Sequence, residues 1–158
     1  MKLKDTFNDI EITGTTVDGF GIARIDNWVG FIPKVMEGDV ADIIITSKKR
    51  NHVFGKIVEL KKQSEQRTAP FCEHFGLCGG CSLQHINYKE QLHIKQKFVE
   101  DTLQRIGKVE VGEIFPIIPC AEVTQYRNRL DFAYGRNYKL VIKDENDFYT
   151  TELTIDKI

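Results

Sequence analysis

Five short apolar runs separated by turn signals occupy the first sixty or so residues, and they limit the fold of this part most. The runs are "IEITGTTV", "GFGIARID", "WVGFIP", "VADIIITS" and "HVFGKIVEL", with turn residues at Asp18-Gly19, Asp26-Asn27 and Gly38-Asp39 between them. Short runs at roughly ten-residue spacing predict strands and disfavour a helix here. We expect a hairpin around Asp26-Asn27 and a bulge or bend at Gly55. Together they predict a small five-stranded barrel over residues 7–63.

An OB-like barrel of this size commonly binds single-stranded nucleic acid through aromatic side chains and basic edges. We expect most of the candidate aromatics to fill the barrel core; they are Phe20, Trp28, Phe31 and Phe54. The net charge of −1 does not by itself indicate a nucleic-acid-binding protein. However, residues 48–67 carry seven basic side chains against two acidic ones. This strip is either a phosphate-binding face or a lysine-protected strand edge. Its candidate contacts are Lys48, Lys49, Arg50 and Lys56.

Three of the four cysteines lie in "FCEHFGLCGGCSLQH", residues 71–85, with the spacing C-x5-C-x2-C. The N-terminus has no apolar signal segment, and no apolar run approaches the ~20 residues of a membrane span. We therefore expect a cytoplasmic protein without membrane contact, whose thiols stay reduced and bind a metal. Thiolates favour iron–sulfur clusters and zinc. The predicted ligands are Cys72, Cys78 and Cys81.

The cysteine spacing alone does not identify the fourth ligand of the metal. Zinc with His74 or His85 is possible, although the x5 gap departs from the usual zinc spacing. An iron–sulfur cluster tolerates longer gaps and takes its last ligand from far along the chain. Cys120 is the remaining cysteine, and we interpret it as a buried small residue after Pro119.

The rest of the chain predicts a linker, one helix and the start of a second β-rich unit. Residues 64–70 are polar and end in Pro70, as a linker would. Asn87 and Glu90 form a capping signal before a helix that stops at Gly107. Its predicted packing face is Tyr88, Leu92, Val99, Leu103 and Ile106. We expect strands at "EIFPIIP" and "YRNRLDFAYGR", and β-like runs at "KLVIK" and "YTTELTI".

These pieces, in this order, resemble the 5-methyluridine RNA methyltransferases that carry an N-terminal TRAM domain and a [4Fe-4S] cluster. "GFGIAR" and "GFIPKVMEGD" resemble TRAM, the cysteine motif resembles the cluster motif, and "IIPCAEVTQYRNRLDFAYG" resembles the opening of the central domain. The resemblance implies a TRAM barrel at 7–63, a linker at 64–70, a cluster loop with its helix at 71–107 and an incomplete central domain at 113–158. The fold class is therefore mainly β with one helix.

The resemblance also implies what the chain lacks. The family's S-adenosylmethionine site, nucleophile and base lie in a C-terminal Rossmann-like domain, and no segment here has that glycine pattern. We expect the RNA-binding and cluster-binding front of such an enzyme, acting on rRNA or tRNA and inactive alone, with no catalytic residue and no DNA partner. Arg127 and Arg129 would face the RNA. The alternative is a stand-alone TRAM adaptor with a structural iron–sulfur or zinc site.

Overall fold

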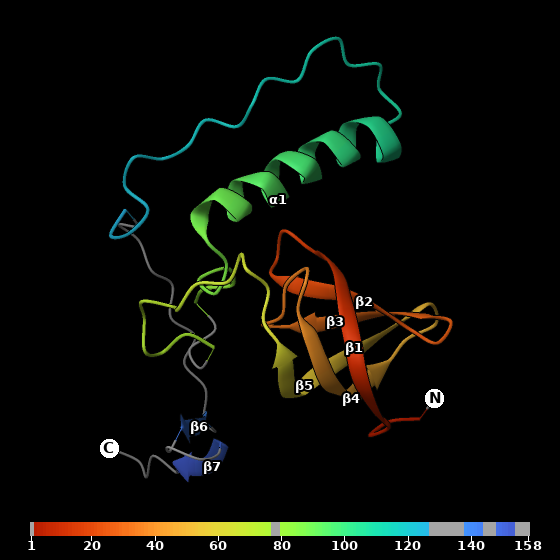
Figure 1. Cartoon of the computed structure of the whole chain (residues 1–158), viewed down its shortest axis with the longest axis vertical. Coiled ribbons are helices and arrows are strands. Elements are labelled where there is room, and N and C mark those ends of the chain that lie inside the picture. Colours follow the sequence, from red (N-terminus) through yellow and green to blue (C-terminus); the bar gives the residue numbers. More distant parts are fainter. Residues whose placement is uncertain (1, 77–79, 127–137, 144–147, 154–158) are drawn as a thin grey trace.

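The computed structural model describes residues 2–76, 80–126, 138–143 and 148–153. Five strands form a closed barrel in the order β1-β2-β3-β5-β4 (Figure 1). The strands are β1 (Thr6–Thr15), β2 (Phe20–Ile25), β3 (Trp28–Pro33), β4 (Val40–Lys48) and β5 (His52–Lys62). Strands β3 and β5 run parallel, and the other neighbours are antiparallel. The predicted five-stranded, OB-like barrel is confirmed.

Local sequence signals account for the turns of the barrel. Ile25 pairs with Trp28 across a two-residue turn, and Asp26 has a φ of 52°. Positive φ at the first central residue is what a tight hairpin turn requires, and Asp tolerates it. On the other side, Gly55 lies opposite Ile45, and the β4–β5 register shifts between Ile45 and Ser47. The expected hairpin and the expected irregularity beside Gly55 are both present.

Aliphatic side chains form the buried core of the barrel, and of the four candidate aromatics only Trp28 is among the partly buried residues that pack against it. The core consists of Ile12, Ala23, Ile25, Ile32, Val35, Ala41, Ile43, Ile45 and Val53. A Cβ added to Gly21 or Gly30 would come within 2.4 Å of the Val35 or Ile25 side chain, so these inward positions have no space for a larger residue. The expectation that most of the aromatics lie in the core was wrong. Phe20, Phe31 and Phe54 are half-buried and alternate with these inward residues, so they lie on the outer face.

Beyond the barrel lies a helix, α1 (Tyr88–Asp101), which a π-helical turn, η1 (Thr102–Ile106), extends. The Asn87 side chain accepts a hydrogen bond from the Glu90 N–H at 2.9 Å, and Gly107 follows the last turn. The predicted cap and stop are therefore confirmed. Ile94 is the buried residue of α1, and it packs with Met36 and Ile86 beside Leu83.

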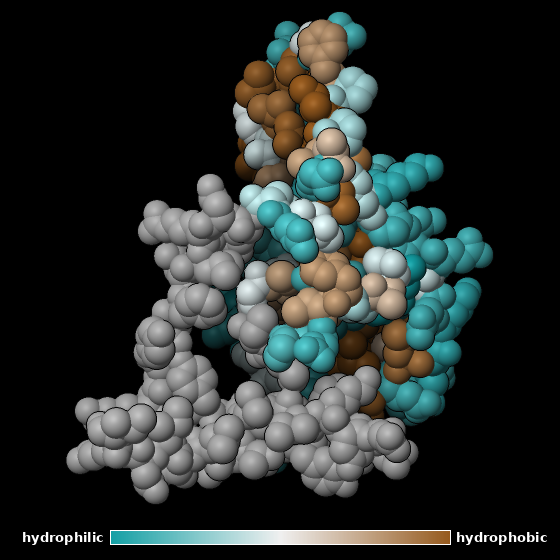
Figure 2. Space-filling view, turned by 90° about the vertical axis from the view of Figure 1, so that its left-hand side faces the viewer, coloured by the Kyte–Doolittle hydropathy of each residue, from teal (hydrophilic) through white to brown (hydrophobic). Residues whose placement is uncertain are grey.

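Ile94 was not part of the predicted helix face, and the members of that face are half-buried or exposed. Val99 is 46% exposed and Ile106 is 76% exposed. Figure 2 shows apolar side chains gathered towards the top of the molecule, where α1 and the segment after it lie. The prediction that one continuous apolar face packs against a core was wrong, because only the N-terminal half of the helix reaches the residues beside the barrel.

The chain then returns alongside α1 without forming a strand (Figure 1). The Gln96 side chain donates to the Phe115 carbonyl at 3.3 Å, and the Cys120 N–H donates to the Tyr88 hydroxyl at 2.7 Å. The predicted strand at residues 113–119 was wrong, since a strand needs a pairing partner, and Phe115 and Ile118 are 74% and 90% exposed. The predicted burial of Cys120 was also wrong, because its side chain is exposed.

A two-stranded antiparallel sheet ends the described chain. It pairs β6 (Tyr138–Lys143) with β7 (Phe148–Leu153), where β-like runs were expected. The strand predicted at residues 126–136 lies almost wholly outside the described residues. Among the helices of the described ranges, none combines the length and apolar character that a membrane span requires.

Candidate RNA-binding face and cysteine loop

Three of the predicted RNA-binding cations lie at the turn between β4 and β5. Lys48 ends β4, and the Lys49 N–H donates to the His52 carbonyl at 2.9 Å across the turn that holds Arg50. All three cationic side chains are exposed. The turn therefore presents its charges to solvent at one end of the barrel.

The indole ring of Trp28 lies beside the same turn. The Lys48 Nζ lies 4.5 Å from the centroid of the Trp28 ring, a cation–π arrangement. Next to it, an open hollow of about 380 Å³ is lined by Asn27, Trp28, Arg50 and Asn51. An aromatic ring, two amides and a guanidinium are groups that can contact a base and a phosphate together.

The outward aromatic side chains form one cluster on β2, β3 and β5. The Phe31 ring centroid lies 5.5 Å from that of His52 and 5.8 Å from that of Phe54. His52 and Phe54 are 5.3 Å apart with nearly perpendicular rings, and Phe20 meets Phe54 edge-on at 6.2 Å. Strands β3 and β5 bring them together because Phe31 is the register partner of Phe54. The cluster is a continuous aromatic surface outside the barrel.

Lys56, the fourth predicted RNA-binding cation, lies on β5 at the opposite end of this cluster from the turn. It is exposed, and it follows Phe54 by two residues on the same face. The Lys56 charge repels that of Lys34. The Lys34 Nζ donates a hydrogen bond to the Gly76 carbonyl at 2.9 Å. Desolvation of that ammonium, with a contribution from the Lys56 charge, lowers the pKa of Lys34. The cluster therefore has cations at both ends.

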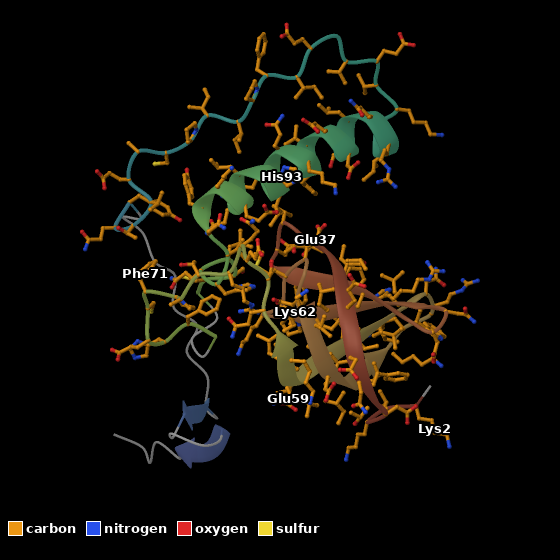
Figure 3. All side chains as sticks on the ribbon, viewed as in Figure 1. Lys2, Glu37, Glu59, Lys62, Phe71 and His93 are labelled. Carbon is orange, nitrogen blue, oxygen red and sulfur yellow. The ribbon has the colours of Figure 1, made fainter. Side chains whose placement is uncertain are left out.

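The cysteine loop packs against the barrel at that second end. Besides the contact with Lys34, the loop lies so close to Gly19 that an added Cβ would be 2.5 Å from the Ser82 carbonyl oxygen. Both Gly19 and Gly76 have φ values above 80°, which favours glycine at these two contacts. Phe71 lies on the outer side of the loop (Figure 3) and is 71% exposed.

A buried ion pair joins the barrel to the segment that precedes the cysteine loop. Asp39 is fully buried, and the Arg67 side chain donates to its carboxylate at 2.9–3.1 Å. The same carboxylate accepts from the N–H groups of Met36 and Ser64, at 2.8 and 2.9 Å. The linker prediction for residues 64–70 did not anticipate this joint. The two residues are 28 positions apart in the sequence, so no local sequence pattern predicts their pairing.

The described cysteines offer the right type of donor for a soft metal centre. Cys72 and Cys81 are free thiols, the first half-buried and the second exposed. The Gln84 side-chain oxygen accepts a hydrogen bond from the Cys72 N–H at 3.3 Å, which ties one end of the loop to the other. Cys78 lies outside the described residues, and within these no three His, Cys, Asp or Glu side chains gather as a metal site. The metal site thus stays a prediction.

His85 is the unusual titratable group beside this loop. It is 2% exposed, and its ring lies 5.5 Å from that of Phe75. Burial, with a contribution from the Arg67 charge, lowers the pKa of His85 to about 4. Its imidazole is therefore neutral near pH 7, the form that binds metals, which keeps the zinc alternative with His85 open.

Sequence reasoning found the cations of the turn but missed three members of this site. His52 and Lys34 were overlooked, although the alternation along β5 and the Pro33-Lys34 turn were visible signals. Asp39 had no visible signal beyond its place in a turn. The two arginines expected to face RNA, Arg127 and Arg129, lie outside the described residues.

Comparison with known proteins agrees with this geometry. Residues 8–58 match the TRAM domain family. An uncharacterized RNA methyltransferase of Bacteroides thetaiotaomicron is 43% identical over 128 residues, which cover 81% of this chain and 28% of the relative. One from Porphyromonas gingivalis is 41% identical over 136 residues, 86% of this chain and 29% of the relative.

The 23S rRNA (uracil(1939)-C(5))-methyltransferase RlmD of Francisella tularensis subsp. novicida is 40% identical over 129 residues. The barrel is a TRAM domain, and the chain is homologous to the N-terminal part of RNA methyltransferases. The matched residues cover 81% of this chain and 29% of the Francisella enzyme. The chain therefore spans less than a third of the length of these relatives.

Proposed function

We propose that this chain is the RNA-binding and cluster-binding N-terminal portion of a SAM-dependent 5-methyluridine methyltransferase acting on rRNA or tRNA in the cytoplasm. The observation that carries the proposal is the basic turn of the TRAM barrel, where Lys48, Lys49 and Arg50 are exposed around Trp28. The uracil-C5 specificity named for the Francisella relative supports the choice of reaction.

The work is divided between regions in this proposal. The cations of the TRAM barrel bind RNA phosphates, and Arg127 and Arg129 add contacts from the following unit. Cys72, Cys78 and Cys81 hold a [4Fe-4S] cluster, or zinc as the alternative, which shapes the loop beside the barrel. Methyl transfer needs a bound methyl donor, a thiolate and a base. We assign these to the part of the relatives that this chain does not span.

RNA titrations at several salt concentrations test the central part of the proposal. Trp28 is the only tryptophan, so quenching of its fluorescence reports binding near the turn. Affinity should fall steeply with salt, because each neutralised phosphate releases counterions. The double variant Lys48→Glu with Lys49→Glu should weaken binding roughly 10-fold or more across sequences and lower the salt slope. Unchanged affinity would reduce the turn to a protected strand edge.

A matched control keeps the total charge change equal. Lys89 and Lys97 are exposed on α1, away from the turn. The double reversal Lys89→Glu with Lys97→Glu should leave the affinity within about 2-fold, because these charges lie outside the proposed interface. An equal loss in both double variants would show that net charge, and not the turn, determines binding.

The metal is tested by composition. Anaerobically purified protein should be brown and contain iron, and substitution of Cys72 or Cys81 by Ser should remove the colour and the iron. Colourless protein with stoichiometric zinc would favour the zinc alternative instead.

A radiolabelled methyl-transfer assay on unmodified rRNA and tRNA separates binding from catalysis. We expect RNA binding without turnover from these 158 residues. The same result is expected of a stand-alone TRAM adaptor, so the assay is repeated after adding the remainder of a relative in trans or by fusion. Restored turnover supports the methyltransferase proposal, and continued inactivity favours the adaptor.

A further inference from the structure

The outer face of β2, β3 and β5 differs in composition from an ordinary solvent-facing sheet. Along β2, β3 and residues 52–56 of β5, nine side chains face outward; they are Phe20, Ile22, Arg24, Val29, Phe31, Pro33, His52, Phe54 and Lys56. Seven of these are apolar or aromatic, two are cationic and none is a carboxylate. On an antiparallel or mixed sheet, the face away from the core is usually polar. The nearest carboxylates along these strands lie beyond this set, at Asp26 in the β2–β3 turn and at Glu59 farther along β5. A half-buried apolar face with cations among its side chains suits a partner that is both stackable and anionic.

We propose that this face is a stacking platform for unpaired RNA bases, formed by Phe20, Phe31, His52 and Phe54. The inference rests on the proposed RNA-binding function and adds the form of RNA that the TRAM domain takes. Aromatic side chains stack on bases with little regard to sequence, because every base has a π-face. Bases within a duplex are not free to stack in this way, so the platform selects single-stranded segments.

Charge is placed to follow the backbone of such a strand. Arg50 lies at the turn, two residues before His52, and Lys56 lies two residues after Phe54, so cations precede and follow the rings along β5. Arg24 is exposed on β2, level with Val29 and thus with His52. In OB-like barrels, the face of the second and third strands and the loop between the fourth and fifth strands are the nucleic-acid surfaces. Both features coincide here.

The platform ends at the cysteine loop. Phe20 follows Gly19, which contacts Ser82, and Lys56 lies near Lys34, which contacts Gly76. A strand lying on the rings would therefore run from the basic turn toward the loop that is proposed to hold the cluster. This direction joins the two proposed sites into one path along the barrel.

Three RNAs of equal length test the inference with the unmodified 158-residue chain: a uridine-rich single strand, the same strand with abasic sites, and a duplex. The abasic strand keeps its phosphates but has no bases to stack. We expect it and the duplex to bind roughly 10-fold or more weakly than the intact strand at the same salt. Equal affinity for the intact and abasic strands would overturn the platform.

Substitutions in the aromatic cluster test whether its rings cause the preference for the intact single strand. Phe31→Leu and Phe54→Leu keep an apolar side chain on the sheet but remove the π-face, and each should weaken binding of the intact strand roughly 5- to 100-fold. The salt slope should stay unchanged, because the phosphate contacts remain. The matched control is Phe115→Leu, at an exposed aromatic on the segment beside α1, which should bind like the unmodified chain. Equal affinities for all three variants would overturn the platform.

The outcomes separate the inference from the function on which it rests. If no RNA binds in a salt-dependent manner, the proposed function fails and the platform with it. If intact and abasic strands bind alike and with the same steep salt dependence, the RNA-binding function stands and the platform alone is wrong. Circular dichroism of each variant checks folding, and the abasic comparison needs no variant at all.

Discussion

The barrel and the helix beside it bury their apolar residues very differently. In the barrel, nine aliphatic side chains form one core with exposed fractions of 1% or less. Along α1, η1 and the returning segment, Ile94 is buried, while Phe98, Ile106 and Phe115 are 50%, 76% and 74% exposed. The barrel therefore carries its own stabilisation, and the helix depends on a short contact near its N-terminus. Surfaces on the barrel can bind a ligand without first being ordered by another unit.

The largest expected effect comes from breaking the buried ion pair that joins the barrel to the segment before the cysteine loop. Asp39→Ala would leave the Arg67 guanidinium and the N–H groups of Met36 and Ser64 without their buried acceptor. Removing one partner of a buried pair costs roughly 3–5 kcal/mol of the free energy of unfolding. Urea unfolding measures it. Arg105→Ala, which removes an exposed pair with Asp101 at 3.4 Å, is the control and should cost less than about 0.5 kcal/mol. Similar losses of unfolding free energy in both variants would show that the buried pair does not stabilise the fold more than an exposed pair does.

A second comparison substitutes isoleucine by alanine once in each region. Ile43 is fully buried in the barrel, and its replacement should reduce the free energy of unfolding by roughly 2–5 kcal/mol through lost burial and a cavity. Ile106 is 76% exposed, and its replacement should change the stability by less than about 0.5 kcal/mol. Denaturant titration with both variants gives the contrast. A large loss at Ile106 would mean that the helix end packs against something in solution.

A smaller effect depends on pH and lies at the boundary between the two regions. The pKa of His85 falls from 6.5 to about 4 on folding, because burial disfavours the imidazolium. Near pH 7 both the folded and the unfolded states are neutral at this residue. As the pH falls from 6.5 towards 4, the unfolded state binds a proton that the folded state does not, and stability is lost, by about 3 kcal/mol at most.

The variant His85→Gln should show this loss reduced when unfolding is followed between pH 7 and pH 4.5. His93→Gln is the control, because His93 is exposed on α1 (Figure 3). Its pH dependence should match that of the unmodified chain. Identical pH profiles for all three proteins would contradict the lowered pKa of His85.

Local signals predicted local structure well in both regions. Asp26-Asn27 predicted the hairpin turn, and Asn87 with Glu90 predicted the helix start, because each signal acts through hydrogen bonds and φ angles within a few residues. Lys48, Lys49 and Arg50 were found as a charge strip, since exposed charge can be read directly from composition. The position of these cations relative to the aromatic cluster depends on how the strands pair, which composition does not show.

The misses have long-range causes. Phe31 and Phe54 were assigned to the core because the sequence does not show that isoleucines already fill it, or that Gly30 leaves no room. The strand predicted at 113–119 failed because apolar character alone does not supply a pairing partner. Asp39 and Arg67 meet across 28 positions, so their pairing becomes visible only when the barrel closes.

Amide hydrogen exchange with and without single-stranded RNA compares the two regions directly and tests whether the TRAM barrel is the RNA-binding surface. We predict slower exchange on RNA binding at residues 28–34 and 49–56, which carry the basic turn and the aromatic cluster. We predict no change at residues 98–118, where the apolar side chains of α1 and the returning segment are exposed. Protection confined to residues 98–118, with the barrel unaffected, would show that the barrel is not the RNA-binding surface.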